Sequence, residues 1–341
     1  GALRFFESYL FGWKQCIQYE GGYSDFTPLL AGVRQGSILG PLLFNIFVID
    51  LETAFVARHT GDCNATTRLI LYADDITALI RSATHVDFER TVERSKASIS
   101  EWCRANFLVL NDDKTQVLRF GARGDDSCAV TLLGLRLDER LSWNVHTQTL
   151  ARALRKTVFL LRRLSFAVSP KVLKNAYHGL FESRLSYGIL LWGGSGGAMP
   201  IFRLQKAAIR LLSGASADTH CRPLFRRLGL LTLPALFILS TLVRVRNNLS
   251  AFPRLGDTHD YGTRHRDMLS VQRLRLTLVQ RRSPDFVGVR LFNRLPEHLR
   301  SLPPRTFANK TKEILLNIAP YAVEEMTTEV WCSDVNVVVR L

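Results

Sequence analysis

Residues 69–80 read LILYADDITALI, so two adjacent carboxylates, Asp74 and Asp75, stand between two apolar arms. The arms, 69–72 and 76–80, have the length and composition of short buried strands. A tight turn between them predicts a β-hairpin with both aspartates at or beside its tip. Carboxylates this close repel each other and resist desolvation unless a cation neutralises them. The stretch therefore predicts a hairpin that holds a ligand.

The aspartate pair has two interpretations. Aspartate is a common turn residue, so the pair could serve the turn alone. Tight hairpin turns favour Asp-Gly or Asn-Gly, however, whereas Ala73 precedes this pair and no glycine follows it. We favour metal binding, because Mg²⁺ or Mn²⁺ prefers carboxylate oxygens and keeps positions for water and substrate phosphates. Two such ions about 4 Å apart stabilise the attacking and leaving oxygens in phosphoryl transfer.

The composition bounds the class of the chain. Its 341 residues, 47% of them hydrophobic, are enough for two or more domains with real cores. The longest apolar runs, such as 234–243, are about ten residues, whereas a membrane span needs about 20, so we expect no membrane segment. The cysteines form no C-x-x-C pair or Cys/His cluster, which indicates no zinc site and a reducing intracellular compartment, nucleus or cytoplasm. Because Gly1 stands inside a helical pattern, we interpret the chain as a fragment of a longer protein.

Charge is distributed unevenly along the chain. Residues 1–140 hold 15 Lys/Arg and 18 Asp/Glu, a net charge of −3. The rest of the chain has a net charge of +18, and the two parts sum to the overall +15. This asymmetry favours a polyanionic partner held mainly by the second half of the chain. A basic surface without any partner is the alternative.

Periodicity predicts a mixed first part and a helical second part. In the first part we expect a helix end over 1–13, two strands within 15–33, a helix over 37–57, the 69–80 hairpin, a helix over 84–102 and strands near 115–120 and 128–137. In the second part we expect helices over 145–166, 170–187, 200–213 and 234–248, an extended basic stretch over 251–282, two short helices and a tail, 335–339, that is an edge strand or disordered.

Several segments, in this order, resemble the reverse transcriptases of jockey-like non-LTR retrotransposons. Tyr72-Ala73-Asp74-Asp75 resembles their catalytic signature. The other matching segments of the polymerase are 32–44 (GVRQGSILGPLLF), 111–115 (NDDKT) and 132–138 (LLGLRLD) with 141–143 (LSW). Three further segments, 183–188, 261–266 and 291–296, are similar to the region that follows the polymerase in those elements.

The resemblance implies a role for individual residues. Asp74 would be a metal ligand and Asp75 would support it, while Lys114 would lie near the nucleotide phosphates and offset charge on the leaving pyrophosphate. Tyr72 would pack near the primer end. Gln35 and Gly36 would sit where nucleotide and template pass, and Leu133 and Gly134 would help to hold the primer. Two bland alternatives stay open: Lys114 as a solvated turn residue and Gly134 as a strand glycine.

The resemblance also implies a fold and an activity. It predicts an α+β fold in which residues 1–140 are a partial palm, 141–250 a helical thumb or connection, and 251–341 a basic post-polymerase region. The implied enzyme is an RNA-directed DNA polymerase that uses Mg²⁺ or Mn²⁺. Its implied partners are an RNA template, a DNA primer and deoxynucleotides.

One feature of the family is missing from the expected place. The first catalytic aspartate of these enzymes precedes the glycine segment, where this chain offers only Asp25 in a dissimilar context. Residues 49–55 (IDLETAF) spell a similar pattern around Asp50, but after the glycine segment, so we interpret Asp50 as a helix-end carboxylate rather than a permuted catalytic residue. We therefore expect that the chain lacks the first aspartate and the fingers and is inactive alone. A non-catalytic nucleic-acid-binding module and an unstable relic are the alternatives.

Overall fold

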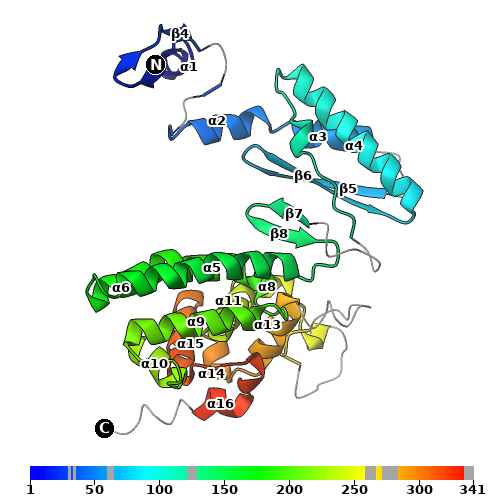
Figure 1. Cartoon of the computed structure of the whole chain (residues 1–341). Helices are drawn as coiled ribbons and strands as arrows, with labels where there is room; N and C mark the ends of the chain where they lie inside the picture. Colours follow the sequence, from blue (N-terminus) through cyan, green and yellow to red (C-terminus); the bar gives the residue numbers. More distant parts are fainter. Residues whose placement is uncertain are drawn as a thin grey trace. The chain divides into compact units, whose positions relative to one another are not determined.

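The computed structural model describes residues 1–29, 32–33, 36–59, 65–120, 129–257, 266–270 and 283–333 (Figure 1). These residues belong to two compact units, Gly1–Thr115 and Gln116–Leu341. Each unit contains helices and antiparallel sheets of two strands. The predicted mixture of helices with small antiparallel sheets is therefore confirmed.

The first unit begins with one helix and four short strands. These elements are α1 (Ala2–Leu10), β1 (Lys14–Gln15), β2 (Gln18–Tyr19), β3 (Gly22–Tyr23) and β4 (Thr27–Pro28). β2 pairs with β3 across Glu20 and Gly21, which both have positive φ, and β1 pairs with β4 outside them. Two strands were predicted within 15–33, whereas the structure has four short ones. No residue of α1 is buried, although its sequence is amphipathic.

The single helix predicted over 37–57 is wrong, because the chain forms two helices there. They are α2 (Gly40–Phe47) and α3 (Leu51–His59), and residues 48–50 separate them. The β-branched side chains of Val48 and Ile49 disfavour helix, while aspartate is favoured just before a helix begins. Asp50 stands at that place, and its carbonyl oxygen accepts the N–H of Ala54 at 2.9 Å.

The hairpin predicted around the aspartates is present. β5 (Ala65–Tyr72) and β6 (Asp75–Ser82) are antiparallel, with Leu69 opposite Ala78 and Leu71 opposite Ile76 on one face. This face packs on α3 and on the long helix α4 (His85–Ala105) in the core of the unit. The opposite face is exposed, including Ile70 and Leu79. The prediction of fully buried arms is therefore wrong for one face of the hairpin.

Two predictions beyond the hairpin have opposite outcomes. Thr84 begins α4 as predicted, and its hydroxyl oxygen accepts the N–H of Asp87 at 3.1 Å. The strand predicted near 115–120 is wrong, because these residues form no strand and follow a short 3₁₀ turn, η1 (Asp112–Lys114).

The second unit opens with a hairpin where a single strand was predicted over 128–137. β7 (Ala129–Leu132) and β8 (Leu135–Asp138) pair across Leu133 and Gly134, whose φ values of 47° and 79° make a left-handed turn. Glycine adopts this conformation freely, but leucine does so rarely. After β8 the carboxylate of Asp138 is fully buried and accepts the N–H groups of Ser142 at 2.7 Å and Trp143 at 2.9 Å.

Helices form most of the described remainder of the second unit, as predicted for residues 145–248. They are α5 (Asn144–Leu164), α6 (Pro170–Tyr177), η2 (His178–Glu182), α7 (Ser183–Ser186), α8 (Ile189–Trp192), α9 (Ala198–Ser213), α10 (Cys221–Leu228), α11 (Leu233–Asn247), η3 (Leu249–Ala251), η4 (Leu255–Asp257), α13 (Pro284–Asn293), α14 (Glu297–Arg300), α15 (Pro304–Ile318), η5 (Val323–Glu325) and α16 (Thr328–Ser333). α5, α9 and α11 match the predicted ranges closely. α10 was not predicted, and more than the two expected helices close the chain.

α11 joins two hydrophobic clusters of the second unit. One cluster includes Tyr177, Trp192 and Phe202 from α6, α8 and α9. The other includes Phe307 from α15 and Trp331 from α16. α11 contributes buried side chains to both, which explains why its sequence is apolar on several sides.

Some predictions fall on residues outside the described ones. Of the basic stretch 251–282, residues 258–265 and 271–282 lie outside, and the described part includes an antiparallel bridge between Arg254 and Leu269. The tail 335–339 also lies outside the described residues. Among the helices that are described, none alone has the length and apolar character of a membrane span. The bent pair α10 and α11, 54° apart, meets that test by length and composition only.

Candidate functional site

The tip of the β5–β6 hairpin gathers three of the predicted site residues. Tyr72 lies opposite Asp75 in the last pair of the ladder, and Ala73 and Asp74 form the two-residue loop. Ala73 has φ of 51°, which lets the loop reverse the chain without glycine. Strand alternation places Tyr72 and Asp75 on the exposed face, opposite to Leu71 and Ile76. The predicted position of both aspartates at the tip is confirmed.

Both carboxylates at the tip are exposed. The apolar arms predicted that Asp74 and Asp75 would be removed from water, and this prediction is wrong. Repulsion between the two carboxylates is weak because water surrounds them. Over the described residues no group of three or more His, Cys, Asp or Glu side chains comes together as a metal site. Mg²⁺ often takes only one or two protein carboxylates and fills its other positions with water and substrate phosphates. The donor chemistry of Asp74 and Asp75 fits that partial role.

The glycine segment contributes a fixed backbone turn. Gly36 has φ of 78°, a conformation that favours glycine, and Gln35 lies outside the described residues. The next residue, Ser37, was expected to begin the helix, but α2 begins at Gly40 with Leu39 as its N-cap. The Ser37 hydroxyl oxygen accepts the N–H of Gly40 at 3.0 Å. Tyr9 of α1 also donates its hydroxyl hydrogen to Ser37 Oγ at 2.6 Å. This junction therefore holds Gly36 where a bulkier residue would be strained.

Lys114 ends a turn that its own motif builds. The side-chain oxygen of Asn111 accepts the Lys114 N–H at 3.1 Å, and the Thr115 hydroxyl donates to the Asn111 carbonyl at 3.0 Å. The asparagine and threonine side chains of the NDDKT segment thus have a local structural reason. The Lys114 side chain is exposed. Its predicted contact with nucleotide phosphates stays a prediction.

Leu133 and Gly134 belong to the second unit, where an unforeseen residue holds them. The Tyr187 hydroxyl donates a hydrogen bond to the Leu133 carbonyl. Its ring lies 3.7 Å from the position that a Cβ on Gly134 would take. A Cβ on Gly188 would lie 2.8 Å from the Leu135 side chain, so glycine allows the close approach of β8. The SRLSYG segment, 183–188, therefore supports the turn, and sequence reasoning did not assign it that task.

The second unit also presents exposed cations in a part of the sequence that has few acids. Between residues 140 and 217 the only acidic residue is Glu182, and its carboxylate pairs with His178. The exposed cations of α5 are Arg152, Arg155, Lys156, Arg162 and Arg163. Phe159 on the same helix is 65% exposed. Exposed cations interleaved with an aromatic ring are typical of surfaces that bind nucleic acid.

Comparison with known proteins identifies relatives of the chain. Residues 2–140 match the family model of the reverse transcriptase (RNA-dependent DNA polymerase). The chain is 27% identical over 248 residues to the probable RNA-directed DNA polymerase from transposon BS of Drosophila melanogaster, covering 67% of the chain and 27% of that protein. It is 25% identical over 236 residues to the RNA-directed DNA polymerase from mobile element jockey of the same species, covering 62% of the chain and 25% of that protein.

A third relative agrees with these two. The probable RNA-directed DNA polymerase from transposon X-element of Drosophila melanogaster is 26% identical over 247 residues, which cover 67% of the chain and 26% of that protein. The chain thus spans about a quarter of the length of these relatives. No solved structure matches the chain.

Proposed function

We propose that the chain is part of an RNA-directed DNA polymerase of a non-LTR retrotransposon. The premise is the match of residues 2–140 to the reverse transcriptase family. The observation that carries this proposal is the hairpin register, which puts Asp74 and Asp75 together at an exposed tip beside Tyr72. Because the acidic tip is exposed, a metal-bound nucleotide and a primer end can reach it without any rearrangement of the hairpin.

The residues at the tip have separate tasks in this proposal. Asp74 and Asp75 hold Mg²⁺ or Mn²⁺, which when bound polarises phosphate oxygens and neutralises the charge that develops on them. Tyr72, on the same face as Asp75, packs against the primer end. Lys114 places its ammonium group near the nucleotide phosphates, where positive charge favours departure of pyrophosphate.

Four further residues position the nucleic acids. Gly36 and Gln35 lie where template and nucleotide pass. Because Gly36 has no Cβ, the nucleic acid can approach the backbone closely there. The turn of Leu133 and Gly134, supported by Tyr187, contacts the primer. The division into a palm over 1–140, a thumb or connection over 141–250 and a post-polymerase region over 251–341 belongs to the same proposal.

We further propose that the 341-residue chain does not synthesise DNA alone. Two metal ions carry four positive charges, and the hairpin offers two carboxylates. Asp50, the other candidate, stands directly before α3, where aspartate is favoured. With too few carboxylates to hold both ions, the primer oxygen is poorly aligned. Alignment of the reacting atoms can lower the activation barrier by about 7–11 kcal/mol, and this contribution is lost.

A primer-extension assay on the purified chain tests this proposal directly. With an RNA template, a DNA primer, deoxynucleotides and Mg²⁺ or Mn²⁺, we expect no incorporation above that of a chain-free control. Incorporation that disappears in the Asp74→Ala variant would show that the chain is a complete catalyst and that the proposed inactivity is wrong.

A second candidate function is nucleic-acid binding by the second unit, and the acid-free basic surface of α5 favours it. Cations that neutralise phosphates release counterions, so the affinity falls as salt rises. We expect the logarithm of the association constant for a single-stranded oligonucleotide to fall linearly with the logarithm of salt concentration, by about 0.7 per phosphate contacted. Fluorescence anisotropy measures this slope. An affinity that stays constant between low and physiological salt would contradict binding through these cations.

A further inference from the structure

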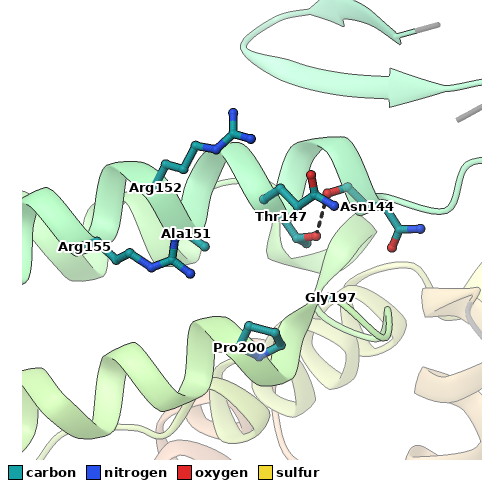
Figure 2. Close-up of a pocket in the computed structure, with 8 residues that line it drawn as sticks. Asn144, Thr147, Ala151, Arg152, Arg155, Gly197 and Pro200 are labelled. Atoms are coloured by element: carbon teal, nitrogen blue, oxygen red, sulfur yellow. Dashed lines mark hydrogen bonds between the residues drawn. The ribbon is translucent and has the colours of Figure 1, made fainter. Parts of the chain in front are cut away.

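A groove of about 380 Å³ lies between α5 and α9 in the second unit (Figure 2). Pockets that hold small ligands have volumes of about 300–1,000 Å³, so this groove has room for one small molecule. A duplex, with its two backbones and stacked pairs, can touch only its rim. The groove therefore suits a single unit of a polymer or a free small molecule.

The charge in the groove is positive and uncompensated. Arg152 and Arg155, three residues apart on neighbouring turns of α5, both line it. Figure 2 shows Arg155 on the side of α5 that faces α9, whereas the Arg152 side chain points to the other side of α5, away from α9. Both side chains are exposed, and neither guanidinium makes an ion pair with any side chain that the structure describes. Neither α5 nor α9 contains an aspartate or a glutamate.

A guanidinium group at the groove without an acid partner favours one class of ligand. The planar donors of Arg155 match the oxygens of a phosphate and bind it through paired, charge-assisted hydrogen bonds. Such bonds are shorter and stronger than those between neutral groups. The groove is therefore built for a phosphate group.

The remaining walls suit the rest of a nucleotide. Ala151 on α5 and Pro200 on α9 give the groove an apolar lining, on which the flat face of a base or sugar can pack. The exposed amide of Gln148 stands at the groove with one acceptor and two donors that can meet a base edge. Gly197 lets the two helices approach closely at one end of it.

We propose that the groove between α5 and α9 binds one phosphate-bearing nucleotide. Its phosphate lies at the guanidinium group of Arg155, its base or sugar lies along Ala151 and Pro200, and Arg152 adds positive charge at the rim. The proposal rests on the nucleic-acid function proposed above, because it assigns a ligand to the same basic unit. An unpaired nucleotide within a strand and a free mononucleotide share this chemistry.

The first experiment compares two variants of equal charge. Binding of a fluorescein-labelled single-stranded oligonucleotide to the whole chain is measured by anisotropy for Arg152→Gln/Arg155→Gln and for Arg162→Gln/Arg163→Gln. Both remove two exposed cations from α5, but only the first pair lines the groove. We expect the groove pair to weaken binding at least about tenfold and the control pair to weaken it much less. Equal losses would show diffuse attraction to the helix and would overturn the groove site.

A second variant blocks the groove without changing its charge. Gln148→Trp keeps every cation and fills the space beside Ala151 with an indole ring. We expect it to weaken oligonucleotide binding as the arginine pair does, while the melting temperature of the chain stays unchanged. Unchanged oligonucleotide binding would overturn the proposal.

A competition arm identifies the source of the nucleotide. Displacement of the oligonucleotide by deoxyadenosine monophosphate from the wild-type chain, but not from Arg152→Gln/Arg155→Gln, assigns the groove to a free nucleotide. Loss of oligonucleotide binding in the variants without such competition assigns it to a nucleotide within a strand. If the oligonucleotide binds all variants equally, the groove proposal fails and the nucleic-acid function stands. If the wild-type chain binds neither probe, both fail.

Discussion

The Asp74→Asn substitution is expected to lower RNA-templated primer extension by at least about a hundredfold in a chimera that carries this chain in place of the matched part of the jockey polymerase. Asparagine keeps the size of the side chain and the two-residue loop of the hairpin, but it removes the negative charge that holds a divalent ion. Loss of one electrostatic group that acts on the transition state costs about 10²–10³-fold in rate. Extension of a labelled primer under single-turnover conditions measures the effect.

The matched control for this prediction is Asp50→Asn. Asp50 is equally exposed and lies in the same unit, in the segment whose letters mimic the first catalytic pattern. Because its position before α3 explains it structurally, we expect the control to change extension by less than a factor of about three. A loss at Asp50 as large as that at Asp74 would support a permuted catalytic order. Undiminished extension by Asp74→Asn would remove the hairpin tip from the polymerase centre.

The Gly197→Ala substitution is expected to destabilise the second unit by about 1–3 kcal/mol, because it overfills a close contact between helices. The added Cβ would lie 2.1 Å from Thr147 Oγ1 and 2.8 Å from Thr147 Cβ. Thr147 is buried, and its hydroxyl donates to the Trp143 carbonyl at 2.8 Å, so it cannot simply turn away. Chemical denaturation followed by tryptophan fluorescence measures the free energy of unfolding.

Gly196→Ala provides an unusually close control. A Cβ on Gly196 meets nothing within 4 Å, although the residue is the immediate neighbour of Gly197. We expect this variant to unfold within about 0.5 kcal/mol of the wild-type chain. Combining Gly197→Ala with Thr147→Ala removes the hydroxyl and a methyl group, so part of the lost stability returns. Equal effects at Gly196 and Gly197 would mean that the contact with Thr147 is not the cause.

Local patterns were enough to predict the elements whose causes lie close in the sequence. The apolar arms on both sides of Asp74 and Asp75 predicted the hairpin, and Thr84 predicted the start of α4. The hairpin tip brought Tyr72, Asp74 and Asp75 together as predicted. What failed was burial: apolar letters on both faces indicated two covered faces, whereas α3 and α4 cover only one.

The missed features have causes far away in the chain. The turn at Leu133 and Gly134 was predicted as a continuous strand, because leucine rarely adopts positive φ and the tyrosine that holds it lies 54 residues downstream. The groove was invisible for the same reason: Arg152 and Arg155 resemble any solvated helix face until α9 packs beside them. Only the break near Val48 had a local signal, which the strong apolar pattern on either side concealed.

The bond from Tyr187 to the Leu133 carbonyl bears on how the protein should be cut for study. The reverse transcriptase match ends at residue 140. A fragment ending there keeps β7 and β8 but loses Tyr187, whose hydroxyl holds the turn between them. An isolated pair of four-residue strands is barely stable in water. Such a fragment would fray at its last hairpin and become a target for proteases, whereas a fragment that keeps the whole second unit would keep the hairpin in place.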